Sequence, residues 1–430
     1  MEKLLRKIEK FIPRKVYKLL QPIYHYILSI IGIIIYKFPG HSIHIIGITG
    51  TKGKSTTTEY VNAVLEAAGY KTAILSTIRF KIADDNKENK YKMTMPGRFF
   101  VSKFIHDAQK VGCEYAIIEM TSEGARFYRH RGIPIDTLIF TNLSPEHIDS
   151  HGSFENYLKA KLSIAKAVER SSKGYKRIIV NKDDAHADNF LVYNVHEKMG
   201  YRLHDWDTKY KHINIKLPGE FNKMNALAAI TFGESLGIND DIIKKGIESV
   251  EVVRGRCEEI KYSDGVNESV IAVIDYAHTP DSLEKMYQLY IQKGKVIAVL
   301  GGTGGGRDTG KRKVMGALAS QYAEKVFVTD EDPYDEDPIA IMSEVATGVE
   351  KSKLEIIFSR REAIHRAIET SLLLQKESKY KTEKETINKI YILITGKGTD
   401  PYIMRANGER EIWDDAMVVR EEIEKIKTSI

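Results

Sequence analysis

The sequence has only two cysteines, Cys113 and Cys257, among 430 residues. They match neither the paired spacing of a zinc site nor the several bridges of a small disulfide-rich protein. Free thiols at this low frequency are typical of a reducing compartment, so we expect a cytoplasmic protein. The sequence also lacks internal repeats of the period found in solenoids, which excludes a repeat architecture.

The sequence has little net charge outside its N-terminus. The whole chain carries +6, while residues 1–18 alone contain seven Lys or Arg against two Glu. The remainder is nearly balanced, which disfavours a general nucleic-acid-binding surface. We therefore expect no nucleic-acid partner.

Residues 19–36, LLQPIYHYILSIIGIIIY, follow the basic stretch and contain no formally charged side chain. A signal peptide is disfavoured because no small-residue cleavage site follows. A full membrane span is marginal, since about 20 apolar residues are needed and Gln21, Pro22, His25 and Ser29 interrupt the run. We expect an interfacial helix or hairpin that brings residues 1–38 to the inner face of the membrane. The alternative is a helical hairpin packed on the soluble body.

Short apolar runs alternate with helical patterns through the rest of the chain. The first series includes SIHIIGIT, TAILST, EYAIIEM, DTLIFTN and RIIVNKDD, and a second begins near residue 250 with VIAVIDY, KVIAVLGG, KVFVTD, LEIIF and IYILITG. This alternation predicts an α/β fold with parallel sheets covered on both faces. We expect a basic, apolar N-terminal segment at 1–40, a central domain at 41–250 and a smaller Rossmann-like domain at 251–430.

The segment GITGTKGKSTTTEY, residues 47–60, lies between a predicted strand and a predicted helix. Small residues let backbone N–H groups converge on a phosphate, a lysine reaches the β- and γ-phosphates, and a hydroxyl binds Mg²⁺. The residues expected to bind nucleotide here are Gly50, Thr51, Gly53, Lys54, Ser55 and Thr56. Ile48 replaces the first glycine of the strict motif, so the loop is a variant. The loop therefore predicts that the central domain is a P-loop-type ATPase domain.

Two further residues are expected near this loop. Glu119 ends one predicted strand, and His147 follows the next. Ligands of open parallel sheets bind beyond the carboxyl ends of the strands, where both residues would join Ser55. A carboxylate and an imidazole beside a phosphate loop predict a metal site, although each residue alone is equally compatible with a structural role.

Six motifs in this order resemble the Mur ligase family, within it most closely the UDP-N-acetylmuramoyl-tripeptide synthetases. They are GITGTKGKSTT, TNLSPEHIDSHGSFENYLKAK, LPGEFNKMNALAAI, VIDYAHTPDSLEKM, GGGRDTGKR and ITGKGTD. The resemblance runs from about residue 43 to 425. It implies an ATP- and Mg²⁺-dependent ligase, expected as a monomer, that adds an amino acid to a peptidoglycan-precursor peptide through an acyl phosphate.

The resemblance also implies roles for individual residues. Lys54 would contact the phosphates, and Lys161, matching a lysine that the family carbamylates, would join Ser55, Glu119 and His147 around the metal. On the nucleotide and amino-acid side the matching residues are Asn222, Asn225, Asp275, Tyr276, His278 and Arg307, and Arg129 matches a position that holds the acceptor.

The sequence departs from the family in three places, one of which is Gly396-Lys397-Gly398-Thr399-Asp400, where the family reads Gly-Lys-Gly-His-Glu. Only about 40 residues precede the phosphate loop, where the family usually has a UDP-binding domain, so we expect that domain to be lacking. Glu331-Asp332-Pro333-Tyr334 stands where meso-diaminopimelate enzymes carry Asp-Asn-Pro-Arg. Without that arginine, Glu331, Asp332 and Asp400 are expected to favour lysine or ornithine, although Tyr334 is equally compatible with a neutral side chain.

Two other functions stay open at this point. One is a related ligase acting on another acid, such as folylpolyglutamate or a poly-amino-acid chain. The other is a membrane-attached nucleotide-binding protein with degenerate catalysis, which the joint presence of Lys54, Glu119, His147 and Lys161 disfavours.

Overall fold

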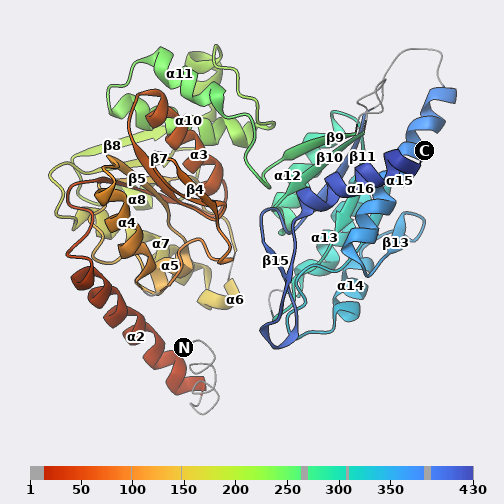
Figure 1. Ribbon diagram of the computed structural model, residues 1–430, viewed down its shortest axis with the longest axis horizontal. Helices are drawn as coiled ribbons and strands as arrows, with labels where there is room; N and C mark the ends of the chain where they lie inside the picture. Colours follow the sequence, from red (N-terminus) through yellow and green to blue (C-terminus); the bar gives the residue numbers. More distant parts are fainter. Residues whose placement is uncertain are drawn as a thin grey trace. The chain divides into compact units, whose positions relative to one another are not determined.

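The computed structural model describes residues 14–97, 99–146, 148–262, 270–306, 309–381 and 389–429. The chain divides into two compact units, Met1–Glu251 and Val252–Ile430. Each is an α/β unit built on its own sheet (Figure 1). The α/β prediction is therefore confirmed.

The first unit contains an eight-stranded sheet in the order β4-β3-β2-β5-β1-β6-β7-β8. Its strands are β1 His44–Thr49, β2 Thr72–Leu75, β3 Arg79–Ile82, β4 Asp85–Glu88, β5 Tyr115–Glu119, β6 Thr137–Phe140, β7 Arg177–Asn181 and β8 Glu197–Tyr201. The strands from β2 to β8 in this order are parallel, while β3 and β4 extend one edge as an antiparallel hairpin. The hairpin is polar, which explains why apolar runs did not predict it.

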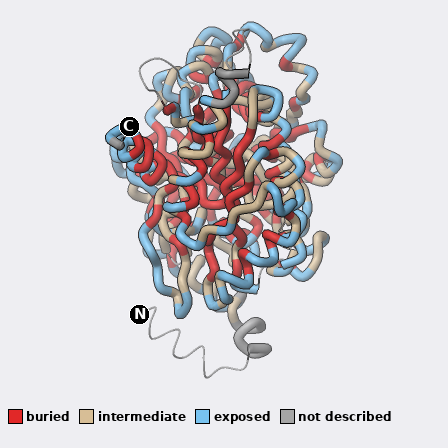
Figure 2. Tube along the Cα trace, turned by 90° about the vertical axis from the view of Figure 1, so that its right-hand side faces the viewer, coloured by how far each residue is buried: buried red, intermediate tan, exposed pale blue. Residues whose placement is uncertain are grey.

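Helices cover both faces of this sheet (Figure 1). One face carries α3 Lys54–Ala67, α10 Glu220–Ser235 and α11 Asp240–Ser249, and the other carries α4 Phe100–Lys110, α5 Ser122–Arg126, α7 Phe154–Glu169 and α8 Ala187–Leu191. Shorter helices are α6 Ile148–His151, α9 Leu203–Asp205 and the π-helical turn η1 Trp206–Tyr210, and α2 Arg14–Ile35 precedes the sheet. The central strands are buried on both faces (Figure 2), as their continuous apolar sequences predict.

The second unit contains a six-stranded sheet in the order β13-β12-β11-β14-β10-β9. Its strands are β9 Glu258–Tyr262, β10 Val270–Asp275, β11 Lys295–Leu300, β12 Lys325–Val328, β13 Leu354–Ile356 and β14 Ile390–Thr395; only β9 pairs antiparallel. The helices are α12 Pro280–Ile291, α13 Lys311–Tyr322, α14 Pro338–Ala346, α15 Arg360–Lys381 and α16 Asp415–Ser429. A small hairpin, β15 Tyr402–Met404 and β16 Arg410–Ile412, encloses the 3₁₀ turn η2 Ala406–Gly408.

Residues 19–36 fall within a single helix, α2, and its continuation into a turn. A hairpin within this run is therefore not what the structure shows. Pro22 lies inside the helix, eight residues after its first residue, and the helix continues past it.

Candidate active site

The phosphate loop follows β1 and leads into α3. Gly50 and Gly53 both have positive φ, 152° and 80°, and Gly53 precedes α3 in the left-handed conformation without a side-chain cap. A Cβ at Gly50 would collide with the Thr141 hydroxyl, and one at Gly53 with the Asn225 amide oxygen. Only glycine fits both positions, and the loop presents the N-terminus of α3, where backbone N–H groups favour an anion.

Two lysine amines converge on the carbonyl oxygen of Gly50. The Nζ of Lys54 donates to it at 3.0 Å and to the Thr51 carbonyl at 2.8 Å, and the Nζ of Lys161 donates to it at 2.6 Å. Lys161 is only 1% exposed and its amine lies 4.8 Å from the centre of the Tyr157 ring. Burial, together with the nearby charge of Lys54, holds the pKa of the Lys161 amine well below its usual range.

Glu119 ends β5 at the same edge of the sheet and is completely buried. Its Oε2 accepts a hydrogen bond from the Thr77 hydroxyl at 2.9 Å, while its Oε1 is buried with no hydrogen-bond partner among the described residues. A buried carboxylate oxygen without a donor is costly, and a cation beside it would remove that cost. This open oxygen is what the predicted metal site requires.

Of the other predicted metal ligands, the structure describes Ser55 but not His147. Ser55 is buried in the first turn of α3, next to buried Thr56. His147 lies outside the described residues, as does Arg307. Within the described part of the chain, no group of three or more His, Cys, Asp or Glu side chains forms a metal-sized cluster. Within the described residues, a metal here would therefore be held by Glu119 and a hydroxyl, and His147 lies outside that set.

Asn222 and Asn225 lie on α10, which packs against α3 behind the loop. The amide oxygen of Asn225 accepts from the Thr57 hydroxyl at 3.3 Å, and its amide nitrogen donates to the Asn222 oxygen at 3.1 Å. Both side chains are buried. The pair ties α10 to α3 just after the loop, a structural contribution that the sequence did not predict.

Asp275 ends β10 in the second unit. Its carboxylate accepts from the backbone N–H groups of Cys257 and Ala277 at 2.8 and 2.7 Å. Burial raises the pKa of this carboxyl, with the Arg256 charge acting against the shift. The ring Nδ1 of His278 lies 2.8 Å from the Tyr276 carbonyl oxygen. Both predicted residues thus lie beyond the carboxyl end of one strand of the second sheet.

The acidic segment after β12 is mostly neutralised within the chain. Asp332 accepts from the Nζ of Lys397 at 3.0 Å, and Asp400 lies 3.5 Å from the same amine. Both carboxylates, which the sequence analysis proposed for the ammonium of an incoming lysine, therefore already have a cationic partner within the chain. Glu331 differs, because its Oε1 accepts from Thr303 at 2.8 Å while its buried Oε2 has no hydrogen-bond partner among the described residues.

Tyr334 stands near these acids. Its backbone N–H donates to the Met404 carbonyl at 3.0 Å, its φ is 53°, and its ring packs beside Gly305. The missing arginine is not replaced by Arg405, because that side chain pairs with Asp330 and Glu411. Lys397 and Arg405 pair with acids of this region, and the sequence analysis did not predict these ion pairs. The acids were recognised in the sequence, but which cation meets which acid depends on the fold.

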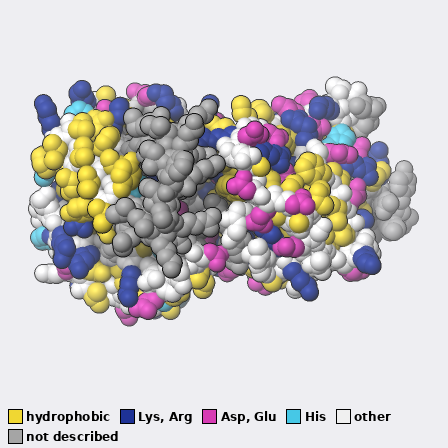
Figure 3. Space-filling view, turned by 90° about the horizontal axis from the view of Figure 1, so that it is seen from below, with side chains coloured by type: hydrophobic (Ala, Val, Ile, Leu, Met, Phe, Trp, Pro, Cys, Tyr) yellow, Lys and Arg dark blue, Asp and Glu magenta, His cyan; other side chains and the backbone are white. Residues whose placement is uncertain are grey.

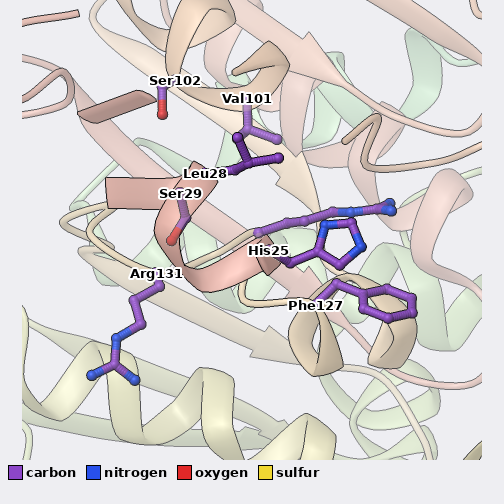
Figure 4. Close-up of a pocket in the computed structure, with 8 residues that line it drawn as sticks. His25, Leu28, Ser29, Val101, Ser102, Phe127 and Arg131 are labelled. Atoms are coloured by element: carbon purple, nitrogen blue, oxygen red, sulfur yellow. The ribbon is translucent and has the colours of Figure 1, made fainter. Parts of the chain in front are cut away.

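Arg129 follows α5, and its guanidinium donates to the Met95 carbonyl and lies 5.5 Å from the centre of the Phe127 ring. Its Nε is buried with no hydrogen-bond partner among the described residues, and burial lowers the pKa of the guanidinium. A small pocket beside it is lined by His25, Leu28, Ser29, Val101, Ser102, Phe127, Arg129 and Arg131 (Figure 4). Residues of α2 thus reach the predicted acceptor-binding arginine.

Comparison with known proteins agrees with this geometry. Residues 48–233 match the model of the Mur ligase middle domain, and residues 255–376 match that of the Mur ligase, glutamate ligase domain. A UDP-N-acetylmuramoyl-L-alanyl-D-glutamate–2,6-diaminopimelate ligase from Syntrophomonas wolfei is 35% identical over 360 residues, which cover 77% of this chain and 72% of that protein.

Several solved structures share this fold. A UDP-N-acetylmuramoyl-L-alanyl-D-glutamate–2,6-diaminopimelate ligase superposes with a TM-score of 0.57 and 26% identity, covering 89% of this chain and 79% of that one. A Mycobacterium tuberculosis folylpolyglutamate synthase superposes with a TM-score of 0.65 and 15% identity, covering 87% of this chain and 92% of that one. At this identity the similarity shows a shared fold alone.

A phosphate loop on a parallel sheet, followed by a second α/β unit, places the chain in the class of nucleotide-binding α/β proteins. The chain belongs to the Mur ligase family, and it is an ATP-dependent ligase.

Proposed function

We propose that this ligase joins an amino acid to a peptidoglycan-precursor peptide, as the tripeptide synthetases of the family do, and forms ADP and phosphate. The observation that carries the proposal is the meeting of three groups at one edge of the first sheet. They are the glycine loop at the start of α3, the open carboxylate oxygen of Glu119 and the buried amine of Lys161. We further propose that residues 41–250 bind ATP and residues 251–430 bind the amino acid.

The phosphate loop fits a nucleoside triphosphate and Mg²⁺. Lys54, which now contacts two loop carbonyls, would turn its amine to the β- and γ-phosphates. Ser55 and the Oε1 of Glu119 would hold the metal together with the predicted ligand His147. Mg²⁺ supplies positive charge that offsets repulsion between the acceptor and the phosphates.

Lys161 fits carbamylation because burial favours its neutral amine, the form that reacts with CO₂. The amine nitrogen forms a bond to the carbon of CO₂ and loses one proton to water. The resulting carbamate is an anion at a position where the unmodified side chain is a base. It would add an oxygen ligand beside Glu119, and hard cations such as Mg²⁺ prefer oxygen ligands.

The chain's residues would then support two displacements. An oxygen of the acceptor carboxylate attacks the γ-phosphorus, and ADP leaves. The amine of the incoming amino acid attacks the acyl carbon, phosphate leaves and the amine loses a proton. Arg129 would hold the acceptor, and Asp275, His278 and Arg307 would bind nucleotide or amino acid. Preorganised charge, rather than a covalent enzyme intermediate, lowers the barrier.

The buried acids inform the choice of amino acid. Glu331 is 3% exposed and retains an oxygen without a hydrogen-bond partner among the described residues. A distal ammonium would satisfy this oxygen, whereas a distal carboxylate would add a second buried anion. We therefore propose lysine or ornithine over meso-diaminopimelate. Competition among lysine, ornithine, meso-diaminopimelate and alanine in one ligation assay tests this choice, and preferred meso-diaminopimelate would refute it.

Release of ADP is the direct test of the proposed function. UDP-linked and lipid-linked muramoyl-dipeptide acceptors, each with and without an amino acid, should stimulate ADP release only when both substrates are present. A folylpolyglutamate-type ligase would respond to a folate acceptor instead, and a degenerate nucleotide-binding protein to none. Lys54→Ala should remove the stimulation without unfolding the chain, because it deletes the charge expected to meet the phosphates. An active, folded Lys54→Ala protein would contradict the assignment of the loop.

A further inference from the structure

Helix α2 has two faces of different character. Its inner face packs on the first unit: the His25 and Phe127 rings lie 4.7 Å apart (Figure 4), and Tyr36 lies 5.6 Å from His106. At Gly32 the helix approaches so closely that a Cβ would lie 3.0 Å from the Phe99 ring. Ile33 is 5% exposed and fits beside Gly132. The helix is therefore seated on the unit in a fixed rotation.

That rotation leaves the outer face covered by large apolar side chains. We call this set the outer stripe: Ile23, Ile27, Ile30, Ile31, Ile34, Ile35 and Phe38, each between 37% and 59% exposed. The residues recur at the spacing of one helical face. Hydrophobic side chains gather in a patch on the face seen in Figure 3. Single exposed apolar residues are ordinary, but a continuous stripe marks an interaction surface.

The charged residues that flank the stripe along the sequence are of one sign. The sequence has no Asp or Glu between Glu9 and Glu59, while Lys10, Arg14, Lys15, Lys18 and Lys37 fall in that interval. On the neighbouring loop the exposed guanidinium of Arg131 stacks over the Tyr26 ring at 4.9 Å. A helix that is apolar on one face and is preceded by a basic stretch in the sequence complements an anionic interface.

We propose that the outer stripe of α2 docks this enzyme on the surface of an anionic phospholipid bilayer. The helix would lie in the interface with its apolar face in the acyl boundary and its cations at the headgroups. None of the helices in the described residues combines the length and apolarity needed to cross a bilayer, which is consistent with surface binding. A second copy is a poorer occupant, because pairing two stripes would bring two basic flanks together.

Flotation of the full chain with vesicles tests the proposal. Vesicles with about 30% phosphatidylglycerol should bind the chain at least about tenfold more tightly than pure phosphatidylcholine, since each cation near an anionic surface contributes about fivefold. Raising the salt to about 0.5 M should release much of the chain, because it shortens the range of these charges. Equal binding to both vesicles, or binding to neither, would overturn the proposal.

The variant Ile27→Glu/Ile34→Glu places two carboxylates on the stripe. It should lower binding to the anionic vesicles by about tenfold or more while leaving circular dichroism and thermal melting unchanged, because both side chains are at least half exposed. The control Val192→Glu/Ile412→Glu adds the same charge at apolar positions that are 74% and 79% exposed elsewhere, and it should bind as the parent does. Equal losses in both variants would show that net charge alone matters.

Analytical sedimentation distinguishes lipid binding from the remaining alternative, in which a second copy of the chain covers the stripe. A parent chain that dimerises without vesicles, fails to bind them and becomes monomeric as Ile27→Glu/Ile34→Glu would identify a second copy as the occupant of the stripe. That result would overturn the lipid assignment. ADP release with soluble substrates should be unaffected by either double variant, so a failure of docking remains distinguishable from a failure of the proposed ligase activity.

Discussion

Two buried lysines, one in each unit, have opposite electrostatic surroundings. Lys161 and Lys397 are 1% and 0% exposed. The amine of Lys397 pairs with Asp332 at 3.0 Å and Asp400 at 3.5 Å and donates to the Tyr402 carbonyl at 2.6 Å. The amine of Lys161 donates to the Gly50 carbonyl, and the attraction of Glu146 only partly offsets the effects of burial and of Lys54 on its pKa.

The difference shows how burial alone can mean either structure or chemistry. An amine matched by carboxylates is satisfied as a cation and cross-links β14 to the acidic segment after β12. An amine without such a match is held towards its neutral form and is available for reaction. The same contrast holds for acids, since Asp332 is neutralised while Glu119 and Glu331 each retain an oxygen without a hydrogen-bond partner among the described residues.

The largest effect that tests this comparison is expected at Lys161. Lys161→Ala should lower ligation on the order of 10³-fold, as loss of a group that stabilises developing charge does, because no carbamate can form. Formate or acetate should restore part of the activity by supplying a carboxylate in the space left by the side chain. Steady-state ADP release with and without these anions is the measurement.

Lys159→Ala is the matched control on the same helix. The Lys159 side chain is exposed and pairs with the exposed Glu155 at 2.7 Å. Its removal should leave ligation nearly unchanged. If Lys161→Ala were as active as Lys159→Ala, both lysines would be structural and the comparison with Lys397 would collapse.

A smaller effect, on stability rather than catalysis, is expected at Lys397. Lys397→Met leaves Asp332 buried without its cation and should lower the free energy of unfolding by about 3–5 kcal/mol. Replacing both partners, Lys397→Met/Asp332→Leu, should recover much of this loss, because no buried charge then remains unmatched. Chemical denaturation of the full chain measures both variants.

The exposed pair Lys285–Asp281 on α12 provides the comparison for this second test. Lys285→Met should change stability by no more than about 0.5 kcal/mol, since solvent screens a surface ion pair. Comparable losses at Lys285 and Lys397 would mean that burial does not decide the strength of these pairs.

Much of this contrast was readable from the sequence, but not all. The glycine loop, the strand ends and the Mur ligase motifs predicted where Lys54, Glu119 and Lys161 would lie, because ligands of parallel sheets bind at carboxyl ends. Sequence spacing did not predict which acids would be neutralised. Lys397 and Asp332 are far apart in the chain and meet because β12 and β14, the strands that precede them, lie on either side of β11 in the second sheet.

The N-terminal segment shows a similar division. The apolar run and its basic flank were evident as composition, and an interfacial helix was one of the structures expected from them. Its rotation was not predictable, since it depends on local fits such as Gly32 against Phe99 and Ile33 beside Gly132. Those contacts decide which isoleucines remain exposed.

The smallest expected effect is a pH dependence that separates the neutral amine from the paired one. The pKa of Lys161 is lower in the folded chain than its ordinary value. Between the two pKa values the unfolded chain binds more protons, so the free energy of unfolding rises with pH there, by at most about 1.4 kcal/mol per pH unit. Denaturation of the parent and Lys161→Met from neutral to alkaline pH, in carbonate-free buffer, should therefore show a steeper rise for the parent. Parallel curves would mean that the amine is charged in the folded chain, and Lys161 would then resemble Lys397.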